Sequence, residues 1–442
     1  MRRAFLFWPA TSLLLLVLTL YVRRDQLGFL PQHGLLQPQD KVQTAPPPPD
    51  AGAVASTATT THPATLPKET MEAHVKAIMS PEATHLPHLE CPKLDTSRYQ
   101  HLQIASQQPP NPAIRYFFAL DLRQCLTLLP RLIGSVVEVM RFLGPPNCAL
   151  SIVEGNSDDG TGEVLAALRP ELEALGITYY FSTTPTDPKQ GDRIAALAQL
   201  RNLAVQPLLD AHRSTSMFPN ESTTTKSSST TITFLNDVAI CPEDILELLH
   251  QRLTLQADMV CAMDWTYVGR DPTFYDVWIA RGMSGDSFFE IPPDGSWDSA
   301  WNLFWNDAAT RERFAARQPF QVFSCWNGAA VFSAAPVVER GVRFRTVREG
   351  ECVQGEPQLF CKDLWWEGYG KIAVVPVVNL EYSDEAGRRI KEEKGYTSRW
   401  VGAPGWRDER IEWQARPPDK VKCMGRYDDQ FFEAWNKSQP GT

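Results

Sequence analysis

Short apolar runs alternate with segments of helical periodicity through the middle of the chain. The apolar runs predict buried strands over residues 115–120, 148–153 and 177–181. The helical periodicity predicts a helix from near Pro130 to Gly144, one over 161–175 before Gly176, and one over 192–209. Strands and helices in alternation predict a largely parallel sheet covered by helices.

Further apolar runs extend the predicted sheet toward the C-terminus. One runs from Thr231 to Leu235 and leads directly into Asn236 and Asp237. The others are predicted as strands over residues 259–263, 322–324, 329–332 and 372–378. The expected class is therefore α/β, a Rossmann-type mostly parallel sheet flanked by helices, although the pattern does not fix the strand order.

An uncharged apolar segment from Ala4 to Val22 lies between Arg2-Arg3 and Arg23-Arg24. It is long enough to cross a bilayer as one helix. Because it ends in Tyr-Val-Arg-Arg rather than a small-residue cleavage site, we interpret it as a retained signal anchor of a single-pass type II protein; a cleaved signal peptide is the alternative. The expected location is the Golgi or ER/Golgi membrane, with the body of the chain in the lumen.

The chain is predicted to have four parts. The cytoplasmic stub and anchor (1–24) precede a Pro/Thr-rich stem (25–112), a catalytic domain (113–425) and a tail (426–442). The stem is expected to be disordered, because such a composition buries little apolar surface, although 71–79 is predicted as a short helix and Cys91 as a point of attachment to the body. The low-complexity segment 212–230 is expected to be a surface insertion.

Composition narrows the functional classes. The 442 residues carry a net charge of -9, and no long basic run follows the anchor, which argues against a nucleic-acid partner. Nine cysteines in a lumenal chain permit disulfides and leave at least one thiol unpaired. Two sequons, at Asn220 and Asn436, are the expected glycosylation sites.

Two strands end in acidic turns. The 148–153 strand leads into Glu154 and Asp159, and the 231–235 strand into Asp237. In open α/β sheets ligands bind at the carboxyl ends of strands, where one carboxylate can contact a base or ribose and another can hold a hard divalent cation. The alternative for Asp159 is that it caps the following helix. The pairing favours a nucleotide-sugar site.

Several motifs carry a family resemblance. The turn Ile-Val-Glu-Gly-Asn-Ser-Asp-Asp-Gly-Thr (152–161) resembles that of many GT-A glycosyltransferases. The helix segment 193–202, Phe-Leu-Asn-Asp-Val (234–238), Cys-Trp-Asn-Gly (325–328) and 360–365 together resemble the fungal capsule-associated α-1,3-mannosyltransferases, glycosyltransferase family 69, over about residues 113–400. The resemblance implies a GT-A-like fold and retaining transfer of mannose from GDP-mannose to a mannoside, with a divalent metal such as Mn²⁺.

The resemblance also implies donor-site roles. Glu154 and Asp159 would contact the nucleotide, and Asn236 with Asp237 stand where such enzymes carry an Asp-x-Asp metal motif. Only one carboxylate is present there, so Asp237 is the expected metal ligand, with Asn236 supporting the metal or the ribose. The alternative is a strand-terminating Asn-Asp turn without metal.

One predicted helix carries basic residues toward the same region. Arg193 and Arg201 lie eight residues apart and therefore share a face, from which a guanidinium can hold phosphate oxygens. Asn202 is expected to position the donor sugar. The alternative is an ordinary solvated edge of an amphipathic helix.

Tryptophans are concentrated in the second half of the chain. Of the thirteen, all except Trp8 lie at residue 265 or beyond. Most are expected to be core residues. Trp326, with Asn327, is expected to bind the acceptor. The candidate catalytic carboxylates are Asp264, Glu356 and Asp363.

Other classes fit less well. The segment 368–373 matches G-x-G-x-x-A but precedes a strand, whereas a dinucleotide site needs a helix there. A glycoside hydrolase needs two carboxylates but leaves the nucleotide-type turns unexplained. The alternatives that stay open are a non-catalytic glycan-binding or scaffold protein of wall or capsule assembly, and a transferase with another sugar donor.

Overall fold

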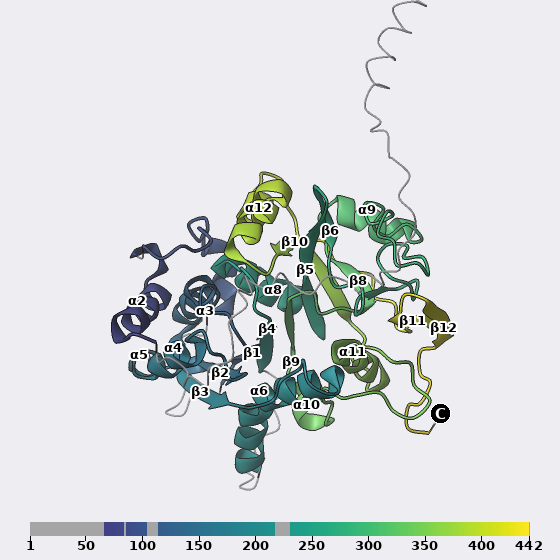
Figure 1. The fold of residues 1–442 in the computed structure, drawn as a ribbon. Helices are drawn as coiled ribbons and strands as arrows, with labels where there is room; N and C mark the ends of the chain where they lie inside the picture. The colour runs from purple at the N-terminus through teal and green to yellow at the C-terminus, as the bar shows by residue number, and fades with distance from the viewer. Residues whose placement is uncertain (1–65, 84, 104–113, 217–229, 442) are drawn as a thin grey trace, which may run out of the picture. The chain divides into compact units, whose positions relative to one another are not determined.

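A ten-stranded sheet forms the centre of the molecule in the computed structural model, which describes residues 66–83, 85–103, 114–216 and 230–441. All of these residues belong to one compact unit, 54–442. The strand order is β3-β2-β1-β4-β9-β5-β10-β8-β7, with β6 paired to β5 (Figure 1). The strands are β1 (Tyr116–Leu122), β2 (Cys148–Glu154), β3 (Thr178–Thr183), β4 (Thr231–Leu235), β5 (Met259–Val268), β6 (Asp271–Phe274), β7 (Arg281–Gly282), β8 (Phe320–Ser324), β9 (Ala329–Ser333) and β10 (Ile372–Leu380).

The sheet is largely parallel, as predicted. Strands β1 to β4 run in one direction, and β5 and β10 are parallel to each other. Between these two groups lies β9, which is antiparallel to both β4 and β5, so all six parallel strands point the same way. Their carboxyl ends consequently lie at one edge of the sheet. The strands predicted from apolar runs are all present.

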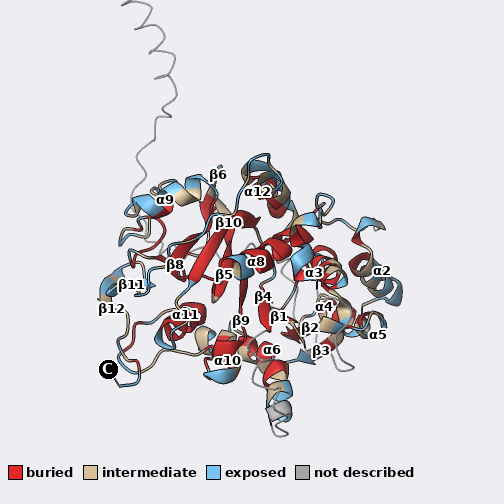
Figure 2. Cartoon of the chain, turned by 180° about the vertical axis from the view of Figure 1, so that it is seen from behind, coloured by how far each residue is buried: buried red, intermediate tan, exposed pale blue. Residues whose placement is uncertain are grey.

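Helices cover both faces of the sheet. Alternate residues of β1 separate into two buried clusters: Phe118 and Leu120 pack with α3 and α8, whereas Phe117 and Ala119 pack with α6 and α11. Figure 2 shows the buried strands between helices whose outer sides are exposed. The helices are α2 (Lys68–Met79), α3 (Leu129–Leu143), α4 (Thr161–Ala167), α5 (Arg169–Ala174), α6 (Arg193–Ser216), α8 (Pro242–Thr254), α9 (Ala308–Ala315), α10 (Ala335–Glu339), α11 (Glu356–Trp366), α12 (Asp384–Lys394) and α13 (Thr397–Val401).

Residues 66–83 and 85–103 of the expected stem (25–112) are folded, which corrects the prediction of disorder for this part. The helix α2 forms over the predicted 71–79 segment, and Ile78, Leu89 and Tyr99 are fully buried against the first cluster. A disulfide joins Cys91 to Cys241, as the proposed attachment of the stem required. The composition argument failed because these few apolar side chains pack on the surface of the sheet domain and not on one another.

Two helix boundaries also differ from prediction. The helix expected over 161–175 is split into α4 and α5, because Pro170 stands in the first turn of α5 and cannot continue the hydrogen bonding of α4. Helix α6 extends beyond 209 to Ser216 and so takes in the start of the expected insertion 212–230. Residues 217–229 lie outside the described part.

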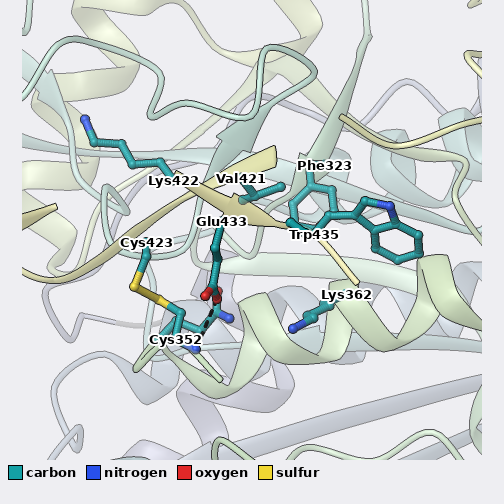
Figure 3. Close-up of a pocket in the computed structure, with 10 residues that line it drawn as sticks. Phe323, Cys352, Lys362, Val421, Lys422, Cys423, Glu433 and Trp435 are labelled. Carbon is teal, nitrogen blue, oxygen red and sulfur yellow. Dashed lines mark hydrogen bonds between the residues drawn. A yellow bond between two sulfur atoms is a disulfide. The ribbon is translucent and has the colours of Figure 1, made fainter. Parts of the chain in front are cut away.

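The expected tail (426–442) is also partly structured. Strand β11 (Lys420–Arg426) pairs with β12 (Asp429–Ala434) in an antiparallel hairpin. A disulfide between Cys352 and Cys423 ties this hairpin to the loop before α11, and the backbone N–H of Cys352 donates to Glu433 at 3.1 Å (Figure 3). The third disulfide joins Cys261 and Cys325. The remaining thiols, all buried, are those of Cys125, Cys148 and Cys361.

Within the described residues no helix combines the length and apolar character needed to cross a membrane. The anchor predicted over 4–22 lies outside the described part of the chain.

Candidate active site

The carboxyl ends of the parallel strands bring several of the sequence-selected residues to one edge of the sheet. Leu122 at the end of β1 pairs with Glu154 at the end of β2. In the other half of the sheet, Leu380 at the end of β10 pairs with Asp264 of β5. Ligand sites of open α/β sheets form at this edge.

Arg201 is the centre of the site. It lies on α6, only 6% exposed, and its Nε donates to Glu356 Oε1 at 2.8 Å. Its Nη1 donates to Asn236 Oδ1 at 3.3 Å and lies 4.0 Å from Asp121 Oδ1. Burial alone would lower the pKa of Arg201, but Asp121 and Glu356 raise it above its ordinary value. The guanidinium is therefore a fixed cation that organises the surrounding carboxylates.

The Cys-Trp-Asn-Gly segment forms a tight turn against this cation. The Trp326 ring lies 4.6 Å from the Arg201 guanidinium, and its Nε1 donates to Asn236 Oδ1 at 2.9 Å. Asn327 and Gly328 both adopt left-handed backbone conformations, with φ of 54° and 78°. A glycine is favoured at the second position, because a Cβ there would meet the Val238 side chain at 3.0 Å.

Asn327 connects the turn to two neighbouring segments. Its backbone N–H donates to Asp276 Oδ2 at 2.9 Å, and its side-chain amide donates to the Ala262 carbonyl at 2.8 Å. Both Trp326 and Asn327 are almost completely buried. Their closest described contacts are thus with the protein, and their predicted role in acceptor binding stays a prediction.

Asp264 is a fully buried acid with an unsatisfied oxygen. Its Oδ2 accepts a hydrogen bond from the Tyr382 hydroxyl at 2.6 Å, whereas its buried Oδ1 has no partner among the described residues. Burial raises the pKa of Asp264 well above its usual range, and nearby Asp276 raises it further. Burial likewise raises the pKa of Asp276 to about 6, against the opposing effects of the Asn327 amide and Arg201. Such groups favour a nearby cation or a proton.

Asp237 is the carboxylate that faces solvent. It is exposed, yet desolvation by the surrounding protein raises its pKa to about 6, against the opposing effect of Arg201. With Tyr382, Gln124 and Cys125, Asp237 lines a cavity of about 440 Å³ between the loop after β1 and the start of α12. An exposed carboxylate at the wall of a cavity is positioned to meet a ligand.

Asp237 is the residue proposed to hold a divalent cation, and no three potential ligand atoms of the described residues lie within 4.8 Å of one another around it. Asp121, whose pKa burial also raises to about 6, interacts electrostatically with Asp237, so the carboxylates outnumber the single guanidinium. Oxygen donors of this kind are the ligands that hard cations prefer. Asn236 fits less well than expected, because its Oδ1 already accepts hydrogen bonds from Arg201 and Trp326.

The first acidic turn is held together by its own carboxylates. Glu154 accepts hydrogen bonds from the backbone N–H groups of Asn156 and Ser157 at 3.0 and 2.7 Å. Asp159 accepts from the Thr161 N–H, at the start of α4, and from the Leu126 N–H, both at 2.9 Å. The helix-start contact is the capping alternative considered for Asp159, and the second contact ties the turn to the loop after β1. Direct contact of either residue with a nucleotide stays a prediction.

The other residues selected on α6 are separated by the fold. Arg193 is exposed at the first position of α6. Asn202 is committed to the backbone of Phe344, to which it donates at 2.8 Å and from which it accepts at 3.1 Å. Only Arg201 of this group has a described contact with the strand-edge residues.

Asp363 lies two helical turns beyond Glu356 on α11 and belongs to a different network. It accepts hydrogen bonds from Arg345 at 2.6 and 2.8 Å and from Gln439 at 2.8 Å. Its described contacts therefore hold the C-terminal segment and do not reach the site. Of the two sequons, Asn436 is partly exposed after β12, and Asn220 lies outside the described residues.

Sequence reasoning missed Asp121, Asp276 and Tyr382. Asp121 had a usable signal, since it is the only charged residue in the apolar strand Tyr-Phe-Phe-Ala-Leu-Asp-Leu, one position before the strand ends. Tyr382 also had a usable signal, because it lies two residues after β10 ends at Leu380. Asp276 had none, because the antiparallel pair of β5 and β6 brings the chain back to the site.

A separate acidic cluster contains Glu247, His250 and Asp408. It is the only place in the described ranges where potential metal-ligand atoms of three residues lie within 4.8 Å of one another. Arg98 already occupies its centre: it donates to Glu247 at 2.8 and 2.9 Å and also pairs with Asp408. His250 lies 3.1 Å from Asp408. This cluster is a protein ion-pair network that fastens residue 98 to α8.

Comparison with known proteins places the chain in a family. The family model described as cryptococcal mannosyltransferase 1 matches residues 115–363. Alpha-1,3-mannosyltransferase CMT1 of Cryptococcus neoformans var. neoformans serotype D is 34% identical over 324 residues, which cover 70% of this chain and 67% of that relative.

Solved structures give weaker overlaps. Mannosyltransferase PcManGT from Pyrobaculum calidifontis, solved with GDP-Man and Mn²⁺, matches with a TM-score of 0.34 and 11% identity over 71% of this chain and 67% of that chain. The S. aureus TarS 1-349 fragment matches with a TM-score of 0.33 and 12% identity, and the match spans 61% of this chain and 60% of that chain. At these scores neither structure bears on the activity. The sequence matches are sufficient by themselves: the chain belongs to the cryptococcal mannosyltransferase 1 family.

Proposed function

We propose that this chain is a retaining mannosyltransferase that moves mannose from GDP-mannose to a mannoside acceptor in α-1,3 linkage, for capsule, cell-wall or glycoconjugate glycans. Family membership and the 34% identical α-1,3-mannosyltransferase support the activity. The observation that carries the proposal is a cluster of residues at the carboxyl edge of the sheet. Asp237 lines a cavity there, and Arg201 donates hydrogen bonds to Glu356 and Asn236.

The residues of the cluster have different proposed roles in mannosyl transfer. A divalent cation held by Asp237, with manganese the expected ion, would neutralise the diphosphate as it leaves. Two hydrogen bonds hold the wall of the site in place. Arg201 donates to Glu356, and Trp326 donates to Asn236. Asp264 is fully buried and does not line the cavity, so its proposed part in transfer is indirect: it holds the hydroxyl of Tyr382, which lines the cavity.

The proposed location is the lumenal side of the Golgi or ER/Golgi membrane, with the segment 4–22 as a type II anchor. The three disulfides support an oxidising compartment, because such bonds persist in secretory but rarely in cytosolic proteins. Sealed microsomes containing the chain should protect the body from added protease. Digestion of the body in intact microsomes would refute this topology.

The donor assignment is tested with the purified full-length chain in detergent. We expect mannosyl transfer from GDP-mannose to an α-mannoside, stimulated by Mn²⁺ and abolished by EDTA, with GDP bound more tightly than UDP. The product linkage is determined by methylation analysis. Tighter binding of UDP would reject the mannose donor, and binding of mannosides without transfer from any donor would favour the non-catalytic alternative.

A further inference from the structure

A second cavity lies away from the candidate active site. Its volume is about 590 Å³, and its walls come from the end of α11, the turn before β10, the segment after α13 and the residue after β12. The lining side chains include Trp365, Trp366, Trp413 and Trp435. Helix α11 begins at Glu356 in the active site and ends at Trp366 in this cavity, so the two places are about 15 Å apart along the helix.

The cavity walls are rigidly built. The Trp365 indole donates to the Phe323 carbonyl at 2.9 Å, and the Trp413 indole donates to the Leu255 carbonyl at 3.3 Å. Gly370 is required beside the first of these rings, because a Cβ there would lie 2.2 Å from Trp365. The cavity therefore exists before any ligand arrives.

Two other lining residues, Trp366 and Trp435, keep free hydrogen-bonding groups. The rings of Trp366 and Trp435 lie 6.2 Å apart and are partly exposed, and their indole N–H groups make no hydrogen bond within the described part of the chain. In Figure 3 the Trp435 side chain extends away from the Cys352–Cys423 disulfide that fixes its hairpin. These two side chains offer aromatic faces together with polar edges.

The charge of the lining limits the ligand. Lys371 is the only charged side chain among the lining residues, although the whole chain has a net charge of -9. A cavity with one cation and no carboxylate disfavours a basic peptide and accepts a neutral or anionic polyol. Sugar rings present C–H faces that pack on indoles and hydroxyls that bond to indole N–H, amide and ammonium groups.

We propose that this cavity is a second glycan-binding site, which holds the acceptor chain at a distance from its reacting end. This proposal rests on the proposed function only in its choice of ligand, a mannose oligosaccharide. It lies at the start of β10, whereas Tyr382 of the active site follows the end of that strand, so the catalytic residues do not contribute to it.

The test compares Trp366→Ala and Trp435→Ala with Trp301→Ala, a matched change of an 81% exposed tryptophan that does not line the cavity. The probe is a linear α-mannose oligosaccharide, titrated by calorimetry into the full-length chain. We expect binding about five- to tenfold weaker in both cavity variants and unchanged in Trp301→Ala. Unchanged binding in both cavity variants, with melting temperatures like the wild type, would overturn the proposal.

Kinetics separate this site from the proposed function. The cavity variants should raise KM for a long acceptor several-fold and leave kcat, and all parameters for a monosaccharide mannoside, unchanged. Asp237→Asn should lose transfer but keep full oligosaccharide binding. A wild-type chain that binds the oligosaccharide through these tryptophans but transfers no mannose would refute the activity and retain the site. An equal loss for short and long acceptors would refute the site.

Two other occupants are outcomes of the same experiment. Asn436 follows Trp435 directly, so the titration is repeated on Asn436→Gln; binding that appears only in this variant would assign the cavity to the chain's own glycan. A peptide of the proline-rich segment 41–50 is titrated in competition, because proline helices also bind aromatic grooves. Tryptophan-dependent binding of this peptide in place of the glycan would overturn the proposal.

Discussion

Asp237 separates catalysis from folding at the scale of a single residue. It is exposed, and its carboxylate accepts no described side-chain hydrogen bond, so Asp237→Asn removes the proposed metal ligand without removing packing. We expect transfer to fall at least about 100-fold, with Mn²⁺-dependent GDP binding lost and the melting temperature within about 2 °C of wild type. Asp429→Asn, an exposed change on β12, is the control. Full Mn²⁺-dependent transfer by folded Asp237→Asn would exclude the metal role.

The pair of Arg201 and Glu356 contributes chiefly through mutual neutralisation. Both are buried, so Arg201→Met leaves a carboxylate unpaired and should cost about 3–5 kcal/mol of unfolding free energy. Adding Glu356→Gln removes the unpaired charge, and urea unfolding of the four variants should give a coupling of about 1–3 kcal/mol.

The control for this cycle is the exposed pair of Arg169 and Glu173, one helical turn apart on α5, changed in the same way. Surface pairs couple by only about 0.3–0.5 kcal/mol. Equal coupling free energies in the two cycles would show that burial does not strengthen the interaction between Arg201 and Glu356.

Site residues in or beside strands could be predicted from the sequence, whereas those that loops bring to the site could not. Asp237 was selected because an apolar strand leads into it, and Trp326 and Arg201 because motifs contained them. Their contacts join residues 201, 236 and 326, which no local pattern can pair. The same limit explains Asn202 and Asp363, whose partners lie in other segments.

At the scale of elements, α2 and the segment through Tyr99 form an added layer on α3 and α8. The Cys91–Cys241 disulfide closes a loop of 150 residues around this layer. Replacing both cysteines by alanine should lower the unfolding free energy by about 2–5 kcal/mol, because the unfolded chain regains conformational freedom. Urea unfolding measures the change. Transfer per folded molecule should stay unchanged; its loss would show that the layer shapes the site.

Elements were predictable where apolar periodicity was strong. The six parallel strands were found because five of them contain a buried apolar run, whereas β3 buries only Tyr179. The largest error is at the end of β5, which continues to Val268. The order of the sheet was not predictable, since inserting β9 between β4 and β5 depends on pairing between segments about 100 residues apart. Folding of residues 66–103 was missed because burial there depends on a surface supplied by the rest of the chain.

For the whole molecule, the crowded carboxylates predict a distinct dependence of stability on pH. Desolvation by the surrounding protein raises the folded pKa of Asp121, Asp237 and Asp276 to about 6 and that of Glu243 to about 7. Since these values exceed the unfolded values, the folded state binds more protons, and stability falls as pH rises from about 4 toward 7. His101, whose pKa is lowered by burial, opposes this trend as a single group.

The metal-free chain should therefore melt at a higher temperature near pH 5.5 than near pH 7.5, and Mn²⁺ should stabilise it more at the higher pH. Scanning calorimetry at both pH values, with EDTA or Mn²⁺, measures this. Asp121→Asn should flatten the metal-free profile, because it removes one of the raised carboxyl groups. A profile that is unchanged in this variant would show that Asp121 does not titrate in this range.

The folding of α2 shortens the tether that the proposed membrane anchor would provide. Under the anchored topology proposed above, a stem of residues 25–112 would allow a reach of about 310 Å when fully extended. With folded structure beginning near Lys68, about 40 residues remain between anchor and body, and their greatest possible span is about 145 Å. The greatest distance from the membrane at which the body can meet an acceptor is then about half as large, which favours glycans that are themselves held near the same membrane.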